Sequence, residues 1–410
     1  MKNKTDGLRS LMPVAEALNS ILDGVQALPE EDVALDDALH RTLARDIAAC
    51  RTQPPAPMSA MDGYAVRTQD ALKGARLEVI GESAAGRPFD KPVGKSEAVR
   101  IFTGGVVPDG ADTIVIQEDV VREHNFITLP EAAPTPRHIR KAGIDFREGD
   151  VLLKRGTRLG DRDLSLAASM NHPTLPVHRK PKVAVFATGD ELVMPGMQPG
   201  PGQIIYSNAY AIRALVRNSG AEAIDLGIAR DTMEDTRAAI RRAEALGADI
   251  LLTTGGASVG EHDLVKPSLE AEGIEIKFWK IALRPGKPVM HGRKGAMRVI
   301  GLPGNPGSSY VCSFLFVVPL IRALLGRAHV EHCIEPAILS HDLPANDHRQ
   351  EYLRARIVIN DNGVAIATTV NHQDSSLVGN LSAANVLMIR RPHASAAQAG
   401  ARCEIIRLPD

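Results

Sequence analysis

The sequence is poor in aromatic residues and in cysteine, and it carries almost no net charge. Aromatic residues make up 3% of the 410 residues, and no spacing typical of an RNA-recognition motif or a zinc finger is present, which argues against readout of nucleic acid bases. A net charge of −1 provides no overall field that would attract nucleic acid or an anionic membrane surface. We therefore expect neither nucleic acid nor a membrane among the partners.

A disulfide framework and a membrane span are also poorly supported. The cysteines include no CxxC pair and are typical of reduced thiols in a cytoplasmic protein; they are Cys50, Cys312, Cys333 and Cys403. No apolar stretch follows the polar N-terminus, so no signal peptide is predicted. The most hydrophobic segment, 310–325, contains Pro319 and Arg322 and falls short of the roughly 20 apolar residues that a bilayer span needs. We expect it to be a buried core helix.

Two proline-rich patches, 53–57 and 130–136, mark the ends of a small domain. Proline removes hydrogen-bond donors and restricts the preceding residue, so both patches interrupt regular structure. Short alternating runs between them, such as 77–80, predict an all-β domain. The expected limits are 54–138 for this inserted domain, with 1–53 and 139–180 joined in one linking domain.

Residues 181–326 alternate between strand-like and helical segments. Strands are expected near 182–187, 222–226 and 249–252, with helices near 207–220 and 231–247 between them. Such alternation requires a largely parallel sheet covered by helices on both faces, which makes a three-layer domain. Ligands bind such domains at the carboxyl ends of the strands, where the sequence places 188–191, Asp231 and 253–263.

After residue 326 the sequence returns to short alternating strands, with Asp361-Asn362-Gly363 as a hairpin turn. A C-terminal β-domain is expected over residues 327–410. The predicted fold class is thus a multidomain α/β plus β protein. It has a central three-layer α/β domain with a mostly parallel sheet, an inserted small β-domain and a C-terminal β-barrel-like domain.

The loop that follows the third strand of the α/β domain has the composition of an anion site. Gly255, Gly256 and Gly260 allow backbone amides to approach a ligand closely and to form a concave anion-binding surface. A helix that begins near Asp263 would direct its positive end to the same place, and the Asp263 carboxylate can hold a hydrated divalent cation. On this loop alone, an ordinary glycine-rich turn is about as plausible.

Several motifs occur together in one order along the chain. They are 59–65 (SAMDGYA), 100–104 (RIFTG), 188–192 (TGDEL), 253–263 (TTGGASVGEHD), 284–288 (RPGKP) and 301–306 (GLPGNP). This series resembles the molybdopterin molybdenumtransferases of the MoeA family, which includes the E-domain of gephyrin. The resemblance covers nearly the whole chain.

The resemblance implies an enzyme of molybdenum cofactor biosynthesis. The family inserts molybdenum from molybdate into adenylylated molybdopterin, releases AMP and uses a divalent cation, here Mg²⁺. Its members are elongated cytoplasmic homodimers of four domains, with an active site between the α/β domain of one subunit and the C-terminal β-domain of the other. The molybdopterin adenylyltransferase and recipient molybdoenzymes are then expected as further partners.

A basic loop is expected to bind the oxyanion. Arg284 and Lys287 lie in a segment stiffened by Pro285 and Pro288. Lys280, which precedes this segment and follows Phe278-Trp279, could reach a phosphate. Fixed cations stabilise the charge that develops when a phosphoanhydride breaks. A solvated basic face is the alternative. The family usually has lysine where Arg284 stands, and the two residues are not interchangeable at a tight site.

The resemblance assigns further positions to molybdate. Pro303 and Pro306 belong to a bent turn, after which Ser308 is either a helix N-cap or an oxyanion ligand. Arg354 and Ser375 fall on positions that complete the molybdate pocket, although Arg354 could instead be an outward strand residue. Pro288 of the basic loop is also expected to contact substrate. Further substrate-binding positions are expected in the strand-end loops: Thr188, Gly189, Asp190, Gly255, Gly256, Ser258 and Gly260.

The acidic residues have several expected roles. Asp231 and Asp263 are expected to bind Mg²⁺ mainly through water, although Asp231 could equally be a helix cap. Glu191 is expected to act as an acid/base or to orient water, or to be exposed without a role. Asp62 and Thr103, in the inserted domain, match positions linked to activity, and Asp62 could also be only a turn former. A cluster of His329, His332 and Cys333 is usually incidental.

Two rival functions remain on the sequence alone. A molybdopterin adenylyltransferase shares the glycine-rich loop and the Gly-Asp-Glu turn, but it has no counterpart of residues 59–65 or of the C-terminal β-domain. A catalytically idle scaffold would be expected to have lost its phosphate- and metal-binding residues, which are retained here apart from the change at Arg284.

Overall fold

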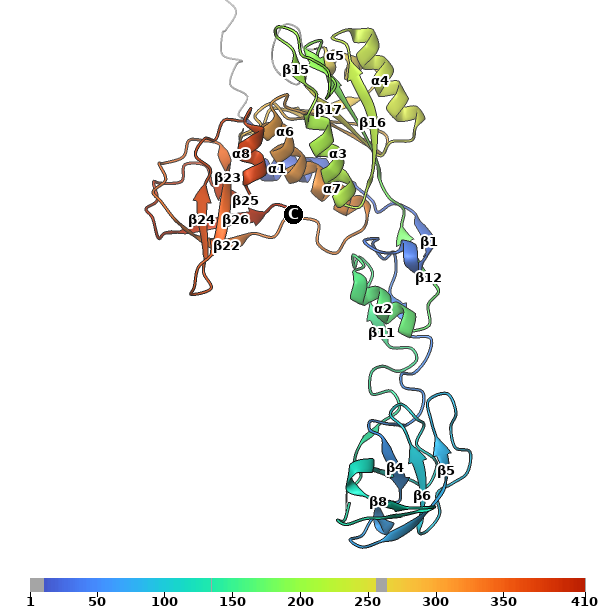
Figure 1. Cartoon of the computed structure of the whole chain (residues 1–410). Helices are drawn as coiled ribbons and strands as arrows, with labels where there is room; N and C mark the ends of the chain where they lie inside the picture. The colour runs from blue at the N-terminus through green and yellow to red at the C-terminus, as the bar shows by residue number, and fades with distance from the viewer. Residues whose placement is uncertain (1–10, 134, 256–263, 410) are drawn as a thin grey trace, which may run out of the picture.

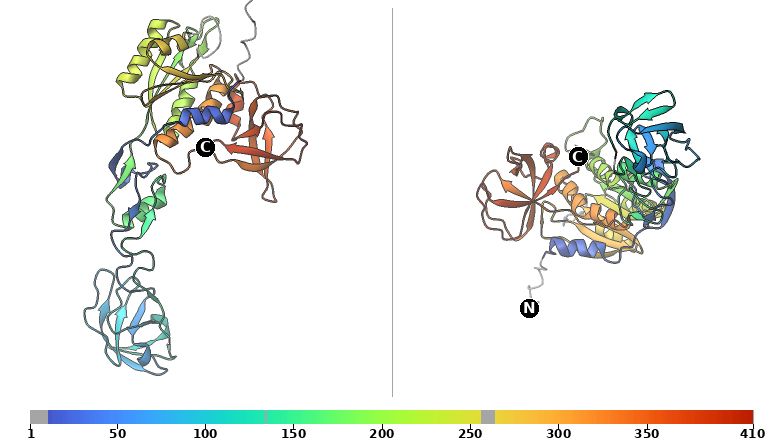
Figure 2. Two further views of the ribbon diagram at one scale, coloured as in Figure 1. Left: turned by 180° about the vertical axis from the view of Figure 1, so that it is seen from behind. Right: turned by 90° about the horizontal axis from the view of Figure 1, so that it is seen from below.

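The computed structural model describes residues 11–133, 135–255 and 264–409, and it is strongly elongated (Figure 1). The α/β domain and the C-terminal β-domain lie side by side at one end, and the inserted β-domain lies at the other. Seen from below, the C-terminal and inserted domains lie on opposite sides of the α/β domain (Figure 2). A site in the α/β domain is therefore remote from the inserted domain of the same chain.

The linking region carries the chain out to the inserted domain and back, and antiparallel strand pairs join the two passages. The pairs are β1 (Glu30–Ala34) with β12 (Thr174–His178), β2 (Ile47–Ala48) with β11 (Val151–Leu153), and β3 (Met58–Ser59) with β10 (Ile139–Arg140). The 3₁₀ turn η1 (Leu35–Asp37) and helix α2 (Asp161–Ser169) lie between them in sequence. Helix α1 (Val14–Leu22) packs instead on the α/β domain through Ala17 and Ile21.

The inserted domain is built around one sheet with the strand order β7-β4-β6-β5-β9-β8. Side chains alternate between the faces of a strand, so Tyr64 and Val66 enter one small core while Ala65 enters another. The elements are β4 (Gly63–Val66), η2 (Thr68–Asp70), β5 (Arg76–Ser83), β6 (Glu97–Ile101), β7 (Thr113–Ile116), η3 (Gln117–Asp119), β8 (Val121–Glu123) and β9 (Phe126–Thr128).

The α/β domain has a sheet in the order β16-β13-β17-β21-β20-β18, with its first four strands parallel and the last two antiparallel. The strands are β13 (Lys182–Thr188), β16 (Glu222–Ala229), β17 (Ile250–Thr254), β18 (Glu275–Trp279), β20 (Met290–Lys294) and β21 (Met297–Leu302). Separate cores on the two sides of the sheet contain Val185 and Phe186. This arrangement confirms the three-layer expectation, and burial on both faces explains why β13 is apolar throughout.

Helices cover both faces of this sheet. They are α3 (Asn208–Asn218), α4 (Met233–Ala245), α5 (Val265–Ala271), α6 (Pro306–Cys312) and α7 (Val318–Leu324), with a short ladder of β14 (Leu192–Val193) and β15 (Ile204–Ile205). Helix α4 begins close to the expected position, and its cap is Thr232 and not Asp231: the Thr232 hydroxyl accepts a hydrogen bond from the Asp235 N–H at 3.1 Å. Ser207 precedes α3 and makes no side-chain capping bond.

The most hydrophobic segment is a core helix. A π-helical turn (Ser313–Val317) joins α6 to α7, where Pro319 cannot donate the regular backbone bond. Residues Pro306–Leu324 are long and apolar enough to cross a membrane by length and composition, but 83% of this apolar stretch is buried inside the protein. Its burial in the α/β core explains the hydrophobicity.

The C-terminal domain is a closed β-barrel. Pairing runs from β23 (Gln350–Ile359) through β24 (Ala365–Thr369), β22 (Glu335–Leu339), β26 (Arg402–Arg407) and β25 (Val386–Arg390) back to β23. Strand β19 (Leu283–Arg284), from the basic loop after β18, pairs with the start of β23. Helix α8 (Val378–Ala383) contacts α6. These two contacts dock the barrel against the α/β domain.

Candidate active site between the α/β domain and the barrel

A pocket of about 410 Å³ opens at the carboxyl ends of the parallel strands β13, β17 and β21. The loops that leave these strands approach one another closely. A Cβ on Gly255 would lie 2.6 Å from the Thr188 carbonyl oxygen, and a Cβ on Gly304 would lie 3.7 Å from Gly255 Cα. Gly255 also has a φ of 85°, which side chains rarely allow. Glycine at 255 therefore lets two loops meet as one pocket wall.

The rest of the pocket wall combines apolar side chains with fixed polar groups. Ile204 and Ile205 of β15 line the pocket with 56% and 37% of their surface exposed. Asn208, also in the lining, donates from Nδ2 to the Gly304 carbonyl at 2.6 Å and ties α3 to the turn after β21. Apolar walls with a few fixed polar groups are typical of sites for small organic ligands.

Carboxylates gather at the edge of this pocket. Glu191 is a lining residue, and its carboxylate covers Gly189, where a Cβ would lie 2.4 Å from Oε2. The Asp190 N–H donates to Asp231 Oδ2, and the Asp231 N–H donates to Asp190 Oδ1, both at 3.3 Å. The sequence pattern assigns Asp190 to substrate binding and does not reveal this pairing. Two adjoining carboxylates fit a hydrated Mg²⁺ better than Asp231 alone.

The barrel closes over the start of helix α6. Pro306 occupies the first turn and Asn305 the N-cap position, a use of proline that costs no backbone donor. The Asn305 side chain donates to Ser375 Oγ at 2.8 Å, and the Gly307 N–H donates to the Ser375 carbonyl at 2.7 Å. Ser308 is therefore not the N-cap. It lies within the first turn and is buried.

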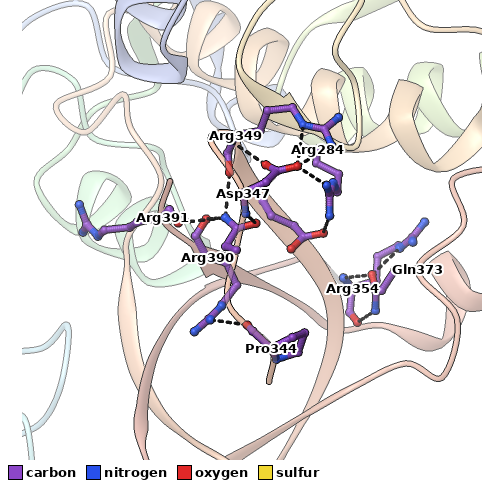
Figure 3. Close-up of polar contacts among 10 residues, drawn as sticks. Arg284, Pro344, Asp347, Arg349, Arg354, Gln373, Arg390 and Arg391 are labelled. Carbon is purple, nitrogen blue, oxygen red and sulfur yellow. Dashed lines mark hydrogen bonds and ion pairs between the residues drawn. The ribbon is translucent and has the colours of Figure 1, made fainter. Parts of the chain in front are cut away.

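Arg354 is fully buried at this boundary and has neutral partners. Its Nε donates to Gln373 Oε1 at 3.2 Å (Figure 3). Its Nη1 donates to the Asp374 backbone carbonyl at 2.9 Å. A Cβ on Gly307 would lie 2.8 Å from Arg354 Nη1, so the guanidinium lies against the start of α6. Burial lowers the pKa of Arg354, and the charges of Asp374 and Glu351 act in the opposite direction. The alternative of an outward strand residue is wrong, and a buried cation that forms no ion pair with the described residues suits an oxyanion.

Arg284 has a different environment from the one expected. Its guanidinium is ion-paired with Asp347 and, at 3.2 Å, with Glu351 (Figure 3). Hydrogen bonds from Arg349, more than the charge of Arg284, hold the pKa of the Asp347 carboxyl well below its usual range. The expected oxyanion role of Arg284 is not supported by this geometry, because barrel carboxylates neutralise its charge.

The remainder of the basic loop still lies beside α6. A Cβ on Gly286 would lie 2.2 Å from Cys312 Sγ, and Cys312 is one helical turn after Ser308, on the same face. Lys287 is exposed and follows Gly286 directly, and among the described residues it has no carboxylate partner. Lys280 places its Nζ 5.0 Å from the Trp279 ring centroid and does not line the strand-end pocket.

Comparisons with known proteins cover the whole of this architecture. Family models match the MoeA N-terminal region (domain I and II) at residues 12–171, a probable molybdopterin binding domain at 184–323 and the MoeA C-terminal region (domain IV) at 336–408. Molybdopterin molybdenumtransferases from Haemophilus influenzae and Bacillus subtilis are each 36% identical, over 88% and 93% of this chain and 89% and 90% of theirs.

A solved structure gives the same result. The molybdopterin biosynthesis MoeA protein from Pyrococcus horikosii superposes with a TM-score of 0.84 at 32% identity, over 98% of this chain and 100% of that chain. The chain belongs to the MoeA family of molybdopterin molybdenumtransferases. The family resemblance and the predicted fold class are thereby confirmed.

The MoeA inserted domain holds the two remaining expected residues far from the pocket. The Thr103 N–H and hydroxyl both donate to Asp62 Oδ1, at 2.7 and 2.8 Å. These bonds, the backbone one foremost, lower the pKa of Asp62. Both residues lie at the far end of the molecule from β13 and β17 (Figure 1). Within one chain they do not join the site.

The expected division of the MoeA site between two subunits stays a prediction. The resemblance assigns the C-terminal β-domain of a second subunit to the active site, whereas Arg354 and Ser375 already contact Gly307 of their own chain. The barrel docks locally because β19 pairs with β23 and α8 contacts α6. The homodimer itself stays a prediction.

Four residues of the expected site lie outside the described residues, so their predicted roles stay predictions. They are Gly256, Ser258, Gly260 and Asp263. The sequence reasoning missed Asn208, Asn305 and Gln373, which fix the pocket wall and Arg354. Of these three residues, only Asn305 had a signal in the sequence, because it precedes Pro306 in the turn that follows β21. Among the described residues, no group of three or more His, Cys, Asp or Glu side chains is placed to hold a metal ion, and this includes the residues near His329.

Proposed function

We propose that this chain transfers molybdenum from molybdate to molybdopterin supplied as its adenylylated form, with release of AMP. The observation that carries the proposal is the juxtaposition of the strand-end pocket with Arg354. Pro306 lines the pocket, and the next residue, Gly307, contacts the buried guanidinium. A site for an organic phosphate and a site for an oxyanion thus adjoin at one helix start. Membership in the molybdopterin molybdenumtransferase family supports the assignment.

The chain's residues divide between two tasks. Ile204, Asn208 and the glycine-lined wall would bind the heterocycle and phosphates, while Arg354, Ser375 and Lys287 would bind the tetrahedral oxyanion. Glu191, which lines the pocket, would orient the water that cleaves the phosphoanhydride into AMP and the terminal phosphate of the pterin product. Holding the two reactants together replaces a bimolecular encounter with an intramolecular one.

Magnesium fits the acidic edge of the pocket. Asp190 and Asp231 would hold the ion through water, with Asp263 as the further predicted ligand. When bound, Mg²⁺ would screen the charge of the diphosphate. The same proposal includes a cytoplasmic location and a homodimer in which the inserted domain of one subunit brings Asp62 and Thr103 to the pocket of the other. The expected exchange with the adenylyltransferase and recipient molybdoenzymes also belongs to it.

The first experiment tests the reaction. Purified protein would be incubated with adenylylated molybdopterin, molybdate and Mg²⁺, and nucleotide and bound molybdenum would be measured. AMP release that depends on molybdate, with loss of the adenylylated pterin, is the expected result. Consumption of ATP without molybdate-dependent AMP release would instead identify an adenylyltransferase.

The second experiment tests the division of the site between subunits. Arg354→Ala and Asp62→Ala chains would be co-expressed. If the inserted domain acts on the other subunit, each heterodimer has one site with both changes and one with neither, so the mixture recovers about a quarter of wild-type activity. The pair Arg354→Ala and Glu191→Ala is the control and should recover none, because both residues belong to the same chain's site. No recovery with the first pair contradicts the shared site.

A further inference from the structure

Three arginines meet at a second cavity, on the side of the α/β domain that faces the linking region. The cavity measures about 1070 Å³ and is lined by Arg158 from the loop before α2, Arg322 from α7 and Arg327 just after α7. The segment that leads from α7 to the barrel forms the rest of its wall. The linking region, the α/β domain and the barrel connection thus contribute to one cavity, whose lining has three arginines and one carboxylate residue, the exposed Glu331.

These arginines have only neutral hydrogen-bond partners among the described residues. Arg158 and Arg327 donate to backbone carbonyls at the end of α3, at 3.5 and 2.6 Å. Arg322 donates to the carbonyls of Val330 and Glu331, at 3.2 and 2.9 Å. Arg327 Nε is buried and has no hydrogen-bond partner. No ion pair links any of the three guanidinium groups to a carboxylate in the part of the chain that the structure describes.

The three charges act on one another. Burial and then the charges of Arg158 and Arg322 lower the pKa of Arg327 to about 10, and burial and then Arg158 lower the pKa of Arg322. His332 donates from Nε2 to a backbone carbonyl in the helix, and burial lowers its pKa to about 4, so it adds no charge at neutral pH. The cationic groups therefore repel one another, and a bound anion would remove that cost.

We propose that this cavity binds a phosphate-type oxyanion, held by Arg158, Arg322 and Arg327. Guanidinium groups match the geometry of phosphate oxygens and bind them in pairs of hydrogen bonds. The cavity is larger than one phosphate group. The anion is therefore either free phosphate or the phosphate of a nucleotide, the rest of which would contact the exposed His329 in the cavity wall. Binding there would join three parts of the chain and is independent of the molybdenum-transfer site.

The test is calorimetric titration of the full-length protein with inorganic phosphate and, separately, with AMP, at constant ionic strength. Arg158 is exposed and has a single 3.5 Å contact, so Arg158→Gln should fold normally. We expect this change to weaken phosphate binding about tenfold, because a charge-assisted bond is removed. Arg327→Gln should weaken it at least as much. Arg162→Gln, at an exposed arginine of α2 outside the cavity, should leave it unchanged.

The AMP titration identifies the source of the phosphate group. If the cavity takes nucleotides, Arg158→Gln weakens AMP binding as it weakens phosphate binding; if it takes free phosphate, only phosphate binding falls. Phosphate binding that is undetectable, or equal in the wild type and Arg158→Gln, overturns the proposal. Because Arg158 is remote from the strand-end pocket residues, molybdate-dependent AMP release by Arg158→Gln reports separately on the proposed function.

Discussion

Arg354 and Arg284 lie at the same boundary between the α/β domain and the barrel, yet their environments are opposite. Arg354 is fully buried and is bound by an amide oxygen and a backbone carbonyl. Arg284 is 42% exposed in its side chain and is neutralised by Asp347 and Glu351. A buried guanidinium without a carboxylate retains its attraction for an anion, whereas a paired one serves mainly to fix orientation. The comparison favours Arg354 over Arg284 for the proposed oxyanion site, and it shows that Arg284 links β19 to the carboxylates of the barrel.

The strongest test of this contrast is Arg354→Gln. Removal of the buried cation should lower molybdenum insertion about 100-fold or more, by analogy with the loss of one preorganised donor to a developing charge. Steady-state AMP release over a molybdate series measures the effect. Arg356→Gln is the control, because Arg356 lies on the same strand but is exposed. Equal activities of the two variants would remove Arg354 from the site.

A smaller effect is expected from Gly307→Ala. The added Cβ would lie 2.8 Å from Arg354 Nη1 and 2.9 Å from the Ser375 carbonyl oxygen, so the guanidinium must shift. We expect about tenfold lower activity, since displacements of this size disturb alignment. Gly379→Ala in α8 is the control, because its Cβ would meet nothing within 4 Å. Unchanged activity of Gly307→Ala would mean that the position of Arg354 is not critical.

Arg284→Lys should have a modest effect, mostly on stability. Lysine keeps the charge but cannot donate to both Asp347 and Glu351 as the planar guanidinium does, and partly exposed ion pairs contribute about 0.5 kcal/mol. We expect turnover to change less than about threefold and the midpoint of urea unfolding to move to a slightly lower urea concentration. A loss of activity comparable to that of Arg354→Gln would instead place Arg284 among the substrate ligands.

The smallest expected effect is a pH dependence at Asp347. The folded-state pKa of Asp347 is lowered by Arg349 first and by Arg284 in addition, so its contribution to stability is present above the unfolded pKa of about 3.9 and declines below it. Asp347→Asn should therefore destabilise the protein at pH 7, and the difference from wild type should shrink at pH 3. Urea unfolding at both pH values measures it. A difference that is constant across this range would show that the charge of Asp347 is unimportant.

The loops of the α/β domain could be located from the sequence because their signals are local. The apolar run before Gly255 acts within a few residues, and the strand that it predicted is observed. The start of helix α4 near residue 231 was predicted in the same way, although its cap at Thr232 was not. The strand expected near 182–187 likewise matches β13 (Lys182–Thr188) to within one residue.

The partners of the charged residues could not be obtained in this way. The sequence shows Arg284 and Arg354 as two arginines in family motifs, without indicating that one meets carboxylates and the other meets Gln373. In the sequence, Asp347 and Glu351 lie 63 and 67 residues from Arg284. Gln373 lies 19 residues from Arg354. Which charges are neutralised depends on how the barrel docks, and this is decided by long-range pairing of β19 with β23.

The sequence by itself determined the family, the order of domains and the loops at the strand ends, because glycine, proline and apolar periodicity act on nearby backbone. The tertiary structure alone decided which arginines form ion pairs with carboxylates and which domains of one chain can share a pocket. The physical reason is that the electrostatic environment of a side chain depends on burial and on neighbours brought together from distant segments, and neither is encoded in local spacing.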